Sequence, residues 1–144
     1  METAIKKILV PIDGSANAER ALIEAKKQVA NTNASVTILT VVKPLFLPYY
    51  GKSEILKEDT KAIEKTKKNL LEVSAGHFED FSGEVETKLR EGNPAEEIIT
   101  ESEEFDYDLI VMGSKGLGVF ARALLGSVSS KVLNHTKTNV LIVK

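Results

Sequence analysis

The sequence predicts an α/β fold in which helices cover a mainly parallel β-sheet. Two observations lead to this prediction. Short apolar, β-branched stretches alternate with helical patterns along the chain, which is typical of parallel strands joined by right-handed crossover helices. The length of 144 residues and a charged fraction of 28% fit one globular domain, residues 1–144. We therefore expect five strands alternating with four helices.

The first strand and helix are joined by a short turn. A strand over residues 5–12 ends at Pro11, which cannot donate a hydrogen bond to a neighbouring strand. Asp13-Gly14-Ser15 then forms a turn, in which Ser15 is a suitable N-cap. Apolar residues recur at helical spacing over residues 16–30, so this segment is predicted to be an amphipathic helix.

The later elements follow the same alternation. A long charged helix is expected over residues 53–76, a short helix begins at Asn93-Pro94, and another helix spans residues 126–135. Residues 84–90 alternate between apolar and polar side chains, which favours a strand at a sheet edge. The other strands are predicted at residues 36–42, 107–112 and 139–143.

The composition excludes several classes of site. Cysteine is absent, so disulfides, thiolate metal sites and cysteine nucleophiles are excluded. His77 and His135 form no cluster with metal-ligand spacing, so we expect no metal site built from side chains. The start of the chain lacks an apolar signal region, and no apolar run approaches the ~20 residues of a membrane span. We therefore expect a cytoplasmic protein with no membrane partner.

Charge is unevenly distributed along the chain. The net charge of −2 gives no reason to expect nucleic acid as a partner. All 21 acidic residues lie at or before Asp108, whereas five of the 19 basic residues lie after it. The last third is therefore positive, and its segment 111–130 contains four of the nine glycines. An electropositive, glycine-rich segment is a candidate for anion binding.

This segment, VMGSKGLGVFARALLGSVSS, predicts a phosphate cradle. It follows a buried strand and leads into a helix, so glycine backbone amides and a helix N-terminus would face one ligand. The hydroxyls of Ser127 and Ser129 can add hydrogen-bond donors. An ordinary loop with a good helix N-cap is the alternative interpretation.

Two general nucleotide motifs fit this segment poorly. A Walker A loop requires Lys-Ser/Thr after its last glycine, but Gly118 is followed by Val119-Phe120. The run from Gly116 to Ala121 matches G-x-G-x-x-G/A, yet no acidic residue follows about 20 positions later to bind a ribose. A Rossmann dehydrogenase is therefore not expected.

Asp13 lies just beyond the first predicted strand, at the same edge as the glycine segment. Its carboxylate can accept hydrogen bonds from a ribose hydroxyl or an adenine amino group, or can simply stabilise its own turn. A haloacid-dehalogenase-type phosphatase would need a nucleophilic aspartate where this chain has Pro11. A receiver domain would need one after the third strand, where Arg90-Glu91-Gly92 stands.

Two further segments leave alternatives open. The aromatic loop 44–51 is either a lid or partner contact, or it folds back onto its own sheet. The last strand, Val140 to Val143, would leave an unpaired apolar edge if it is terminal in the sheet. Dimerisation through this strand is our hypothesis.

Together these residues resemble the nucleotide-binding branch of the universal stress protein family. That branch carries the motif G-x2-G-x9-G-S/T, which Gly113, Gly116 and Gly126-Ser127 match without a gap. The segments ILVPIDGS (residues 8–15) and GNPAEEI (residues 92–98) are also similar to the family's, so the resemblance covers the whole chain.

The resemblance implies a three-layer sandwich with an open five-stranded parallel sheet in the order 3-2-1-4-5, similar to Rossmann-like and adenine-nucleotide α-hydrolase folds. It also implies a homodimer through the last strand, and ATP or AMP bound with Mg or Mn held through the phosphates. Pro11, Asp13 and Val41 would hold the adenosine. The residues implied for ribose and phosphates are Gly113, Ser114, Lys115, Gly116, Gly118, Val119, Gly126, Ser127, Val128 and Ser129. Many family members have His or Arg where this chain has Lys115.

The expected function is therefore a nucleotide-dependent regulatory or stress-response protein with at most slow ATP hydrolysis. No general base, arginine finger or metal-binding carboxylate is evident beside the cradle, and we assign no catalytic residue. Two alternatives stay open. One is an adenine-nucleotide α-hydrolase-type enzyme, and the other is an interaction module that does not depend on nucleotide.

Overall fold

The computed structural model of the chain describes residues 5–44, 53–116 and 125–144. Its elements are β1 (Lys7–Pro11), α1 (Ala16–Val29), β2 (Ser35–Val42), α2 (Ser53–Ala75), the 3-10 turn η1 (Gly76–Phe78), β3 (Val85–Glu91), α3 (Pro94–Glu104), β4 (Leu109–Gly113), α4 (Ser127–His135) and β5 (Asn139–Val143). Each predicted strand and helix is present. The aromatic loop 44–51 lies outside the described residues except for Pro44.

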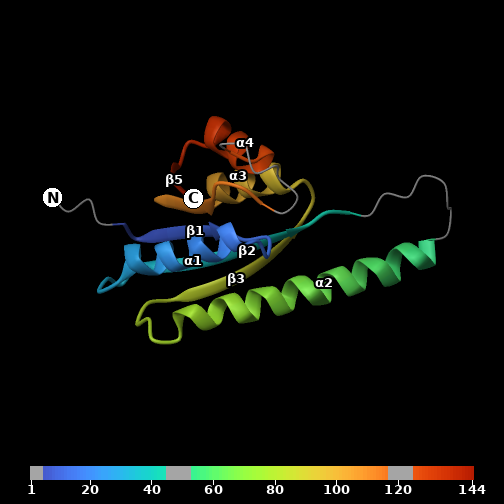
Figure 1. Cartoon of the computed structure of the whole chain (residues 1–144), viewed down its shortest axis with the longest axis horizontal. Helices are drawn as coiled ribbons and strands as arrows, with labels where there is room; N and C mark the ends of the chain where they lie inside the picture. Colours follow the sequence, from blue (N-terminus) through green and yellow to red (C-terminus); the bar gives the residue numbers. More distant parts are fainter. Residues whose placement is uncertain (1–4, 45–52, 117–124) are drawn as a thin grey trace.

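The five strands form one sheet in the order β3-β2-β1-β4-β5, and each neighbouring pair is parallel (Figure 1). The expected open parallel sheet and its strand order are confirmed. The chain moves outward from β1 to β2 and β3, then crosses to the other side of β1 for β4. Strand order therefore reverses between β1 and β4, and a crevice opens at the carboxyl ends of strands at such a point.

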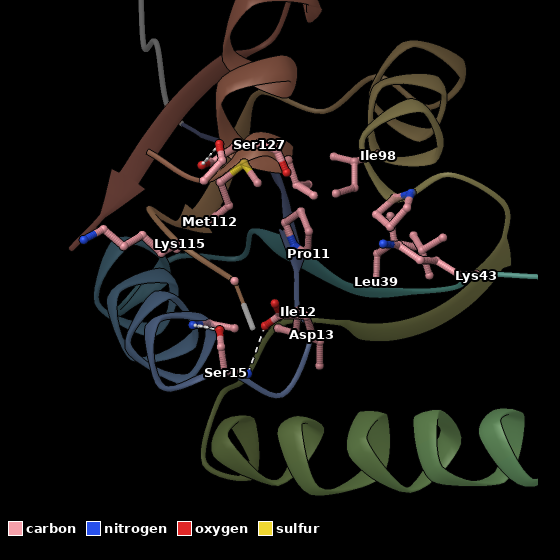
Figure 2. A pocket seen from close by; sticks show the side chains of 18 of the residues that line it. Pro11, Ile12, Asp13, Ser15, Leu39, Lys43, Ile98, Met112, Lys115 and Ser127 are labelled. Carbon is pink, nitrogen blue, oxygen red and sulfur yellow. Dashed lines mark hydrogen bonds between the residues drawn. The ribbon is translucent and has the colours of Figure 1, made fainter. Parts of the chain in front are cut away.

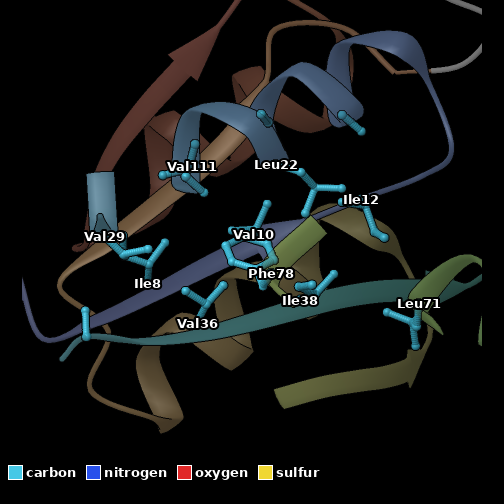
Figure 3. Close-up of a cluster of buried hydrophobic side chains, with 14 residues drawn as sticks. Ile8, Val10, Ile12, Leu22, Val29, Val36, Ile38, Leu71, Phe78 and Val111 are labelled. Atoms are coloured by element: carbon cyan, nitrogen blue, oxygen red, sulfur yellow. The ribbon is translucent and has the colours of Figure 1, made fainter. Parts of the chain in front are cut away.

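Helices cover both faces of the sheet, α1 and α2 on one and α3 and α4 on the other (Figure 1). Alternate residues of β1 pack against the helices on opposite faces of the sheet, because successive side chains of a strand point to opposite faces. Ile8 and Val10 pack with Val29 of α1 on the first face (Figure 3). Leu9 packs with Ile98 of α3 on the second. The result is the expected three-layer sandwich with two apolar cores.

Two helices begin as their sequences predict. The hydroxyl of Ser15 accepts a hydrogen bond from the amide of Ala18 at 3.1 Å, which caps α1. The side chain of Asn93 accepts one from the amide of Glu96 at 3.1 Å, and Pro94 occupies the first turn of α3. These caps place the starts of both helices beside the carboxyl ends of the strands.

A buried carboxylate joins α3 to the edge strand β3. Glu101 is only 1% exposed, and it accepts hydrogen bonds from Lys88 at 2.9 Å, Arg90 at 2.9 Å and Tyr107 at 2.7 Å. Burial disfavours the charge on Glu101, but these three donors together hold its pKa below the ordinary value. Burial also raises the pKa of Tyr107, so its hydroxyl stays protonated and donates.

Strands β3 and β5 are the two edges of the sheet. The edge position predicted for residues 84–90 is confirmed, and the last strand meets the condition on which the dimer hypothesis depends. In the described ranges, no helix is both long and apolar enough to cross a bilayer.

Candidate functional site

A cavity of about 420 Å³ lies at the carboxyl ends of β1, β2 and β4 (Figure 2). This volume is within the range of small-molecule sites. The cavity coincides with the reversal of strand order between β1 and β4, which is where open α/β sheets bind their ligands.

Apolar side chains from several elements form much of the cavity wall. Leu39 and Met112 come from β2 and β4, Ile98 comes from α3, and Pro11 and Ile12 come from the end of β1. The amide of Ile12 donates to the carbonyl of Leu39 at 2.8 Å, which holds the end of β1 against β2. A wall of this kind suits an apolar part of a ligand.

The turn after β1 brings a carboxylate to the cavity. Asp13 accepts a hydrogen bond from the amide of Ser15 at 2.9 Å, and Gly14 between them has a φ of +89° that favours glycine. The local interpretation of Asp13 as a turn-stabilising residue is therefore confirmed. A Cβ atom added at Gly116 would overlap with the other carboxylate oxygen of Asp13. The backbone at Gly116 thus lies directly against Asp13.

Ser114 connects the glycine segment to three elements. Its amide donates to the carbonyl of Val143 in β5 at 2.8 Å. Its hydroxyl accepts from Asn17 of α1 at 3.1 Å, and its carbonyl accepts from the amide of Gly126 at 2.7 Å. The hydroxyl of Ser129 also donates to this carbonyl at 2.7 Å. These bonds hold the N-terminus of α4 at the end of β4.

The N-terminus of α4 faces the cavity. Gly126 is its N-cap, and Ser127, Val128 and Ser129 of the first turn line the cavity. The first amides of a helix have no acceptor within the helix, and no side chain among the described residues caps those of α4. The positive end of the helix dipole therefore points at the cavity, which suits an anionic group.

Three lysines line the cavity among the residues that the structure describes. Lys43 follows β2, Lys67 belongs to α2 and Lys115 follows β4. Figure 2 shows Lys43 and Lys115 on opposite sides of Pro11. Among the lining residues that the structure describes, Asp13 is the sole carboxylate. Positive charge thus exceeds negative charge among these described lining residues.

No metal site is built from the described side chains. Within residues 5–44, 53–116 and 125–144, no group of three His, Asp or Glu side chains is placed to hold a metal ion. His135 lies in the last turn of α4, where its Nδ1 atom hydrogen-bonds the carbonyl of Lys131 at 2.9 Å. This is the helix C-terminal position expected for a dipole partner.

A sequence model of the universal stress protein family matches residues 4–144. The chain belongs to this family. A universal stress protein of Methanocaldococcus jannaschii is 34% identical to it over 99% of this chain and 84% of that protein.

Solved structures of family members have the same fold. The universal stress protein UspA from Lactobacillus plantarum superposes with a TM-score of 0.91 at 26% identity, covering 99% of this chain and 100% of that one. A universal stress protein in complex with cAMP superposes with a TM-score of 0.70 at 28% identity, covering 99% of both chains.

Most of the residues that family resemblance implies for the site line this cavity. They are Pro11, Asp13, Val41, Gly113, Lys115, Gly116, Gly126, Ser127, Val128 and Ser129. Ser114 is instead buried beside the cavity, with its polar atoms bonded to Asn17, Val143 and α4. Gly118 and Val119 lie outside the described residues.

Several lining residues were not predicted from the sequence to belong to the site, among them Lys43, Ile63 and Lys67. Ile63 and Lys67 are four residues apart in α2, on one side of that helix. Helical spacing indicates that they share a face, but the packing of α2 on the sheet is needed to bring that face to the site.

Proposed function

We propose that this universal stress protein binds an adenine nucleotide, ATP or AMP, in the cavity and acts as a nucleotide-dependent regulatory or stress-response protein of the cytoplasm. One observation carries the proposal: a single cavity combines an apolar wall, a carboxylate, exposed glycine backbone and the N-terminus of α4. The complex of a 28% identical relative with cAMP supports an adenine nucleotide as the ligand class.

The nucleoside would occupy the side of the cavity formed by β1 and β2. Pro11 and Val41 supply apolar contact for the base, and Asp13 offers a carboxylate oxygen to a ribose hydroxyl or an amino group. Because a carboxylate repels phosphate, Asp13 favours placing the phosphates on the other side, toward α4. The polarity of the cavity therefore orients the ligand.

The phosphates would lie along the glycine segment. Gly113 and Gly116 present backbone without side chains, Lys115 adds a positive charge, and the first amides of α4 donate to phosphate oxygens. The residues proposed for this part are Gly113, Ser114, Lys115, Gly116, Gly118, Val119, Gly126, Ser127, Val128 and Ser129. Ser114 and Ser129 would act by holding the segment in place, since the Ser129 hydroxyl already donates to the carbonyl of Ser114.

A divalent ion would enter with the nucleotide. A protein-held Mg or Mn site needs several oxygen ligands, and Asp13 alone among the described lining residues supplies a carboxylate. The cavity residues therefore do not fit a resident metal ion. Mg or Mn would be carried by the phosphates, and we propose at most slow hydrolysis of ATP.

A homodimer through β5 is part of the proposal. β5 is an edge strand whose residues Val140 to Val143 are all partly exposed. Such an edge presents unpaired backbone groups that natural proteins usually cover. Light scattering should give the mass of two chains, and a single-chain mass at all accessible concentrations would contradict the dimer.

The binding proposal is tested by comparing native protein with Gly116→Ala and Gly76→Ala. Native protein purified, denatured and passed over an ion-exchange column should release adenine nucleotide, or its apo form should bind ATP by calorimetry. Gly116→Ala introduces a Cβ that must displace the Asp13 carboxylate, so the hydrogen bond proposed between Asp13 and the nucleoside would be lost and ATP affinity should fall about tenfold. Gly76→Ala is the control, because a Cβ there meets nothing within 4 Å.

Native protein that neither releases nor binds adenine nucleotide would refute the proposal. ATP turnover well above one per minute with a defined second substrate would favour the enzyme alternative. An activity of the protein that is unchanged in Gly116→Ala would favour an interaction module that does not depend on nucleotide.

A further inference from the structure

Lys67 occupies a position in α2 where a charged residue is unusual. Leu71 and Ser74 are buried against the sheet, so they mark the inward side of this helix. Lys67 is four residues before Leu71 and four after Ile63, which places it on the same side. It is half-buried, whereas the neighbouring Lys68 is exposed.

The positive charge of Lys67 has no partner in the part of the chain that the structure describes. Its side chain forms no ion pair or hydrogen bond there, although other lysines do, such as Lys88 with Glu101 and Lys26 with Asp80. Partly buried charges are normally paired, because water no longer solvates them fully. An anionic ligand in the cavity that Lys67 lines would supply the missing partner.

Lys67 acts in a cavity that already favours anions. Lys43 follows β2, Lys67 lies in α2 and Lys115 follows β4, and Asp13 is the one carboxylate among the described lining residues. Lys43 and Lys67 lie on the β2 side of the cavity, where the nucleoside is placed, so they would attract the phosphates across the cavity and not by direct contact. This attraction grows with the charge of the ligand. A nucleoside triphosphate gains most from it, a singly charged cyclic monophosphate gains little, and an uncharged nucleoside gains nothing.

We propose that Lys67 is a specificity-determining residue, which together with Lys43 selects nucleotides with several negative charges over singly charged ones. The inference rests on the proposed function and deepens it: ATP is preferred over cAMP, the ligand in the complex of the 28% identical relative. A purely structural role for Lys67 is the competing explanation, because a lysine stem can cover apolar surface such as Ile63.

The test compares charge and packing at this one position. Calorimetry gives the dissociation constants of ATP, AMP, cAMP and adenosine for native protein, Lys67→Met, Lys67→Arg and the control Lys68→Met. Methionine keeps the apolar stem and removes the charge. We expect Lys67→Met to weaken ATP about 3- to 10-fold, cAMP less than about 2-fold and adenosine not at all. Lys67→Arg and Lys68→Met should bind all four compounds with native affinity. The loss of ATP affinity in Lys67→Met should become smaller at high salt.

The possible outcomes separate the two proposals. Equal losses for ATP and adenosine in Lys67→Met, or no loss for ATP, would overturn the role of Lys67 while leaving nucleotide binding intact. An equal loss for ATP in Lys68→Met would also overturn it, because the effect would then be one of general surface charge. Native protein that binds none of the four compounds would overturn both proposals. Unchanged far-UV circular dichroism in each variant ensures that folded proteins are compared.

Discussion

Gly113 should be required for the stability of the fold as well as for the site. It is the last residue of β4, where α1 crosses the strand. A Cβ atom at this position would lie 2.8 Å from the carbonyl carbon of Asn17, 2.9 Å from its Cβ and 3.0 Å from its carbonyl oxygen. Two of these atoms are backbone, so the clash cannot be relieved by rotating a side chain.

The cost follows from which parts must move. Gly113→Ala forces α1 away from β4, in a region where Val111 of β4 and Ala21 of α1 are fully buried in the same apolar core. Overpacking of this kind costs about 1–3 kcal/mol, and because the contacts involve backbone we expect Gly113→Ala to cost no less than the middle of this range, about 2 kcal/mol. For a domain of this size that corresponds to a drop in Tm of roughly 6 °C.

Gly76→Ala is the matched control for this substitution. Its added Cβ meets open space, and its φ is not in the left-handed region. Alanine there restricts the unfolded chain, so we expect no loss and a gain of about 0.4–1 kcal/mol.

Urea unfolding followed by far-UV circular dichroism measures both variants, since the chain has no tryptophan to report on the transition. If the free energy of unfolding of Gly113→Ala is within about 0.5 kcal/mol of that of native protein, the contact with Asn17 does not limit the packing of α1.

Three further predictions concern buried polar groups. Glu101→Gln should lower the free energy of unfolding by about 2–3 kcal/mol, because two cations of β3 lose the buried charge they share. Since the folded pKa of Glu101 lies below its ordinary value of 4.5, the stability that its charge contributes is present above that pH and lost as the pH falls further. The difference in urea stability between native protein and Glu101→Gln should therefore narrow from about pH 5 toward pH 3. Ser129→Ala should cost about 1–2 kcal/mol and weaken ATP binding, because the carbonyl of Ser114 loses a donor.

Neighbouring residues on the same helices provide controls. Glu103→Gln changes an exposed carboxylate of α3 and should shift stability by less than about 0.5 kcal/mol. Ser130→Ala removes a hydroxyl of α4 that makes no hydrogen bond to the described residues, and its effect should be equally small. If Glu101→Gln and Glu103→Gln unfold alike, the buried network does not stabilise the fold. If the difference in stability between native protein and Glu101→Gln stays constant between about pH 5 and pH 3, the expected titration of Glu101 is contradicted. If Ser129→Ala is as stable as Ser130→Ala, the hydrogen bond from Ser129 to the carbonyl of Ser114 does not stabilise the fold.

The elements and the main motif of the site were predictable from sequence because they depend on local rules. Helical periodicity predicts α1, and side-chain oxygens at Ser15 and Asn93 predict where α1 and α3 begin, since a cap acts within three residues. Strand ends that carry Asp13 and Gly113 were also predictable, because parallel strands present their carboxyl ends at one edge of the sheet. Resemblance to the family added the strand order.

Tertiary structure decided what lies opposite these residues. Lys67 and Asp13 are far apart in the chain, and only the packing of α2 brings them to one cavity. Ser114 follows the same local pattern as its neighbours, yet contacts with α1, β5 and α4 hold it beside the cavity as a structural link. Glu101 reads as one of several glutamates in α3, but pairing with β3 buries it. Periodicity determines which face a residue occupies on its own helix or strand, whereas the packing of distant elements determines what that face meets.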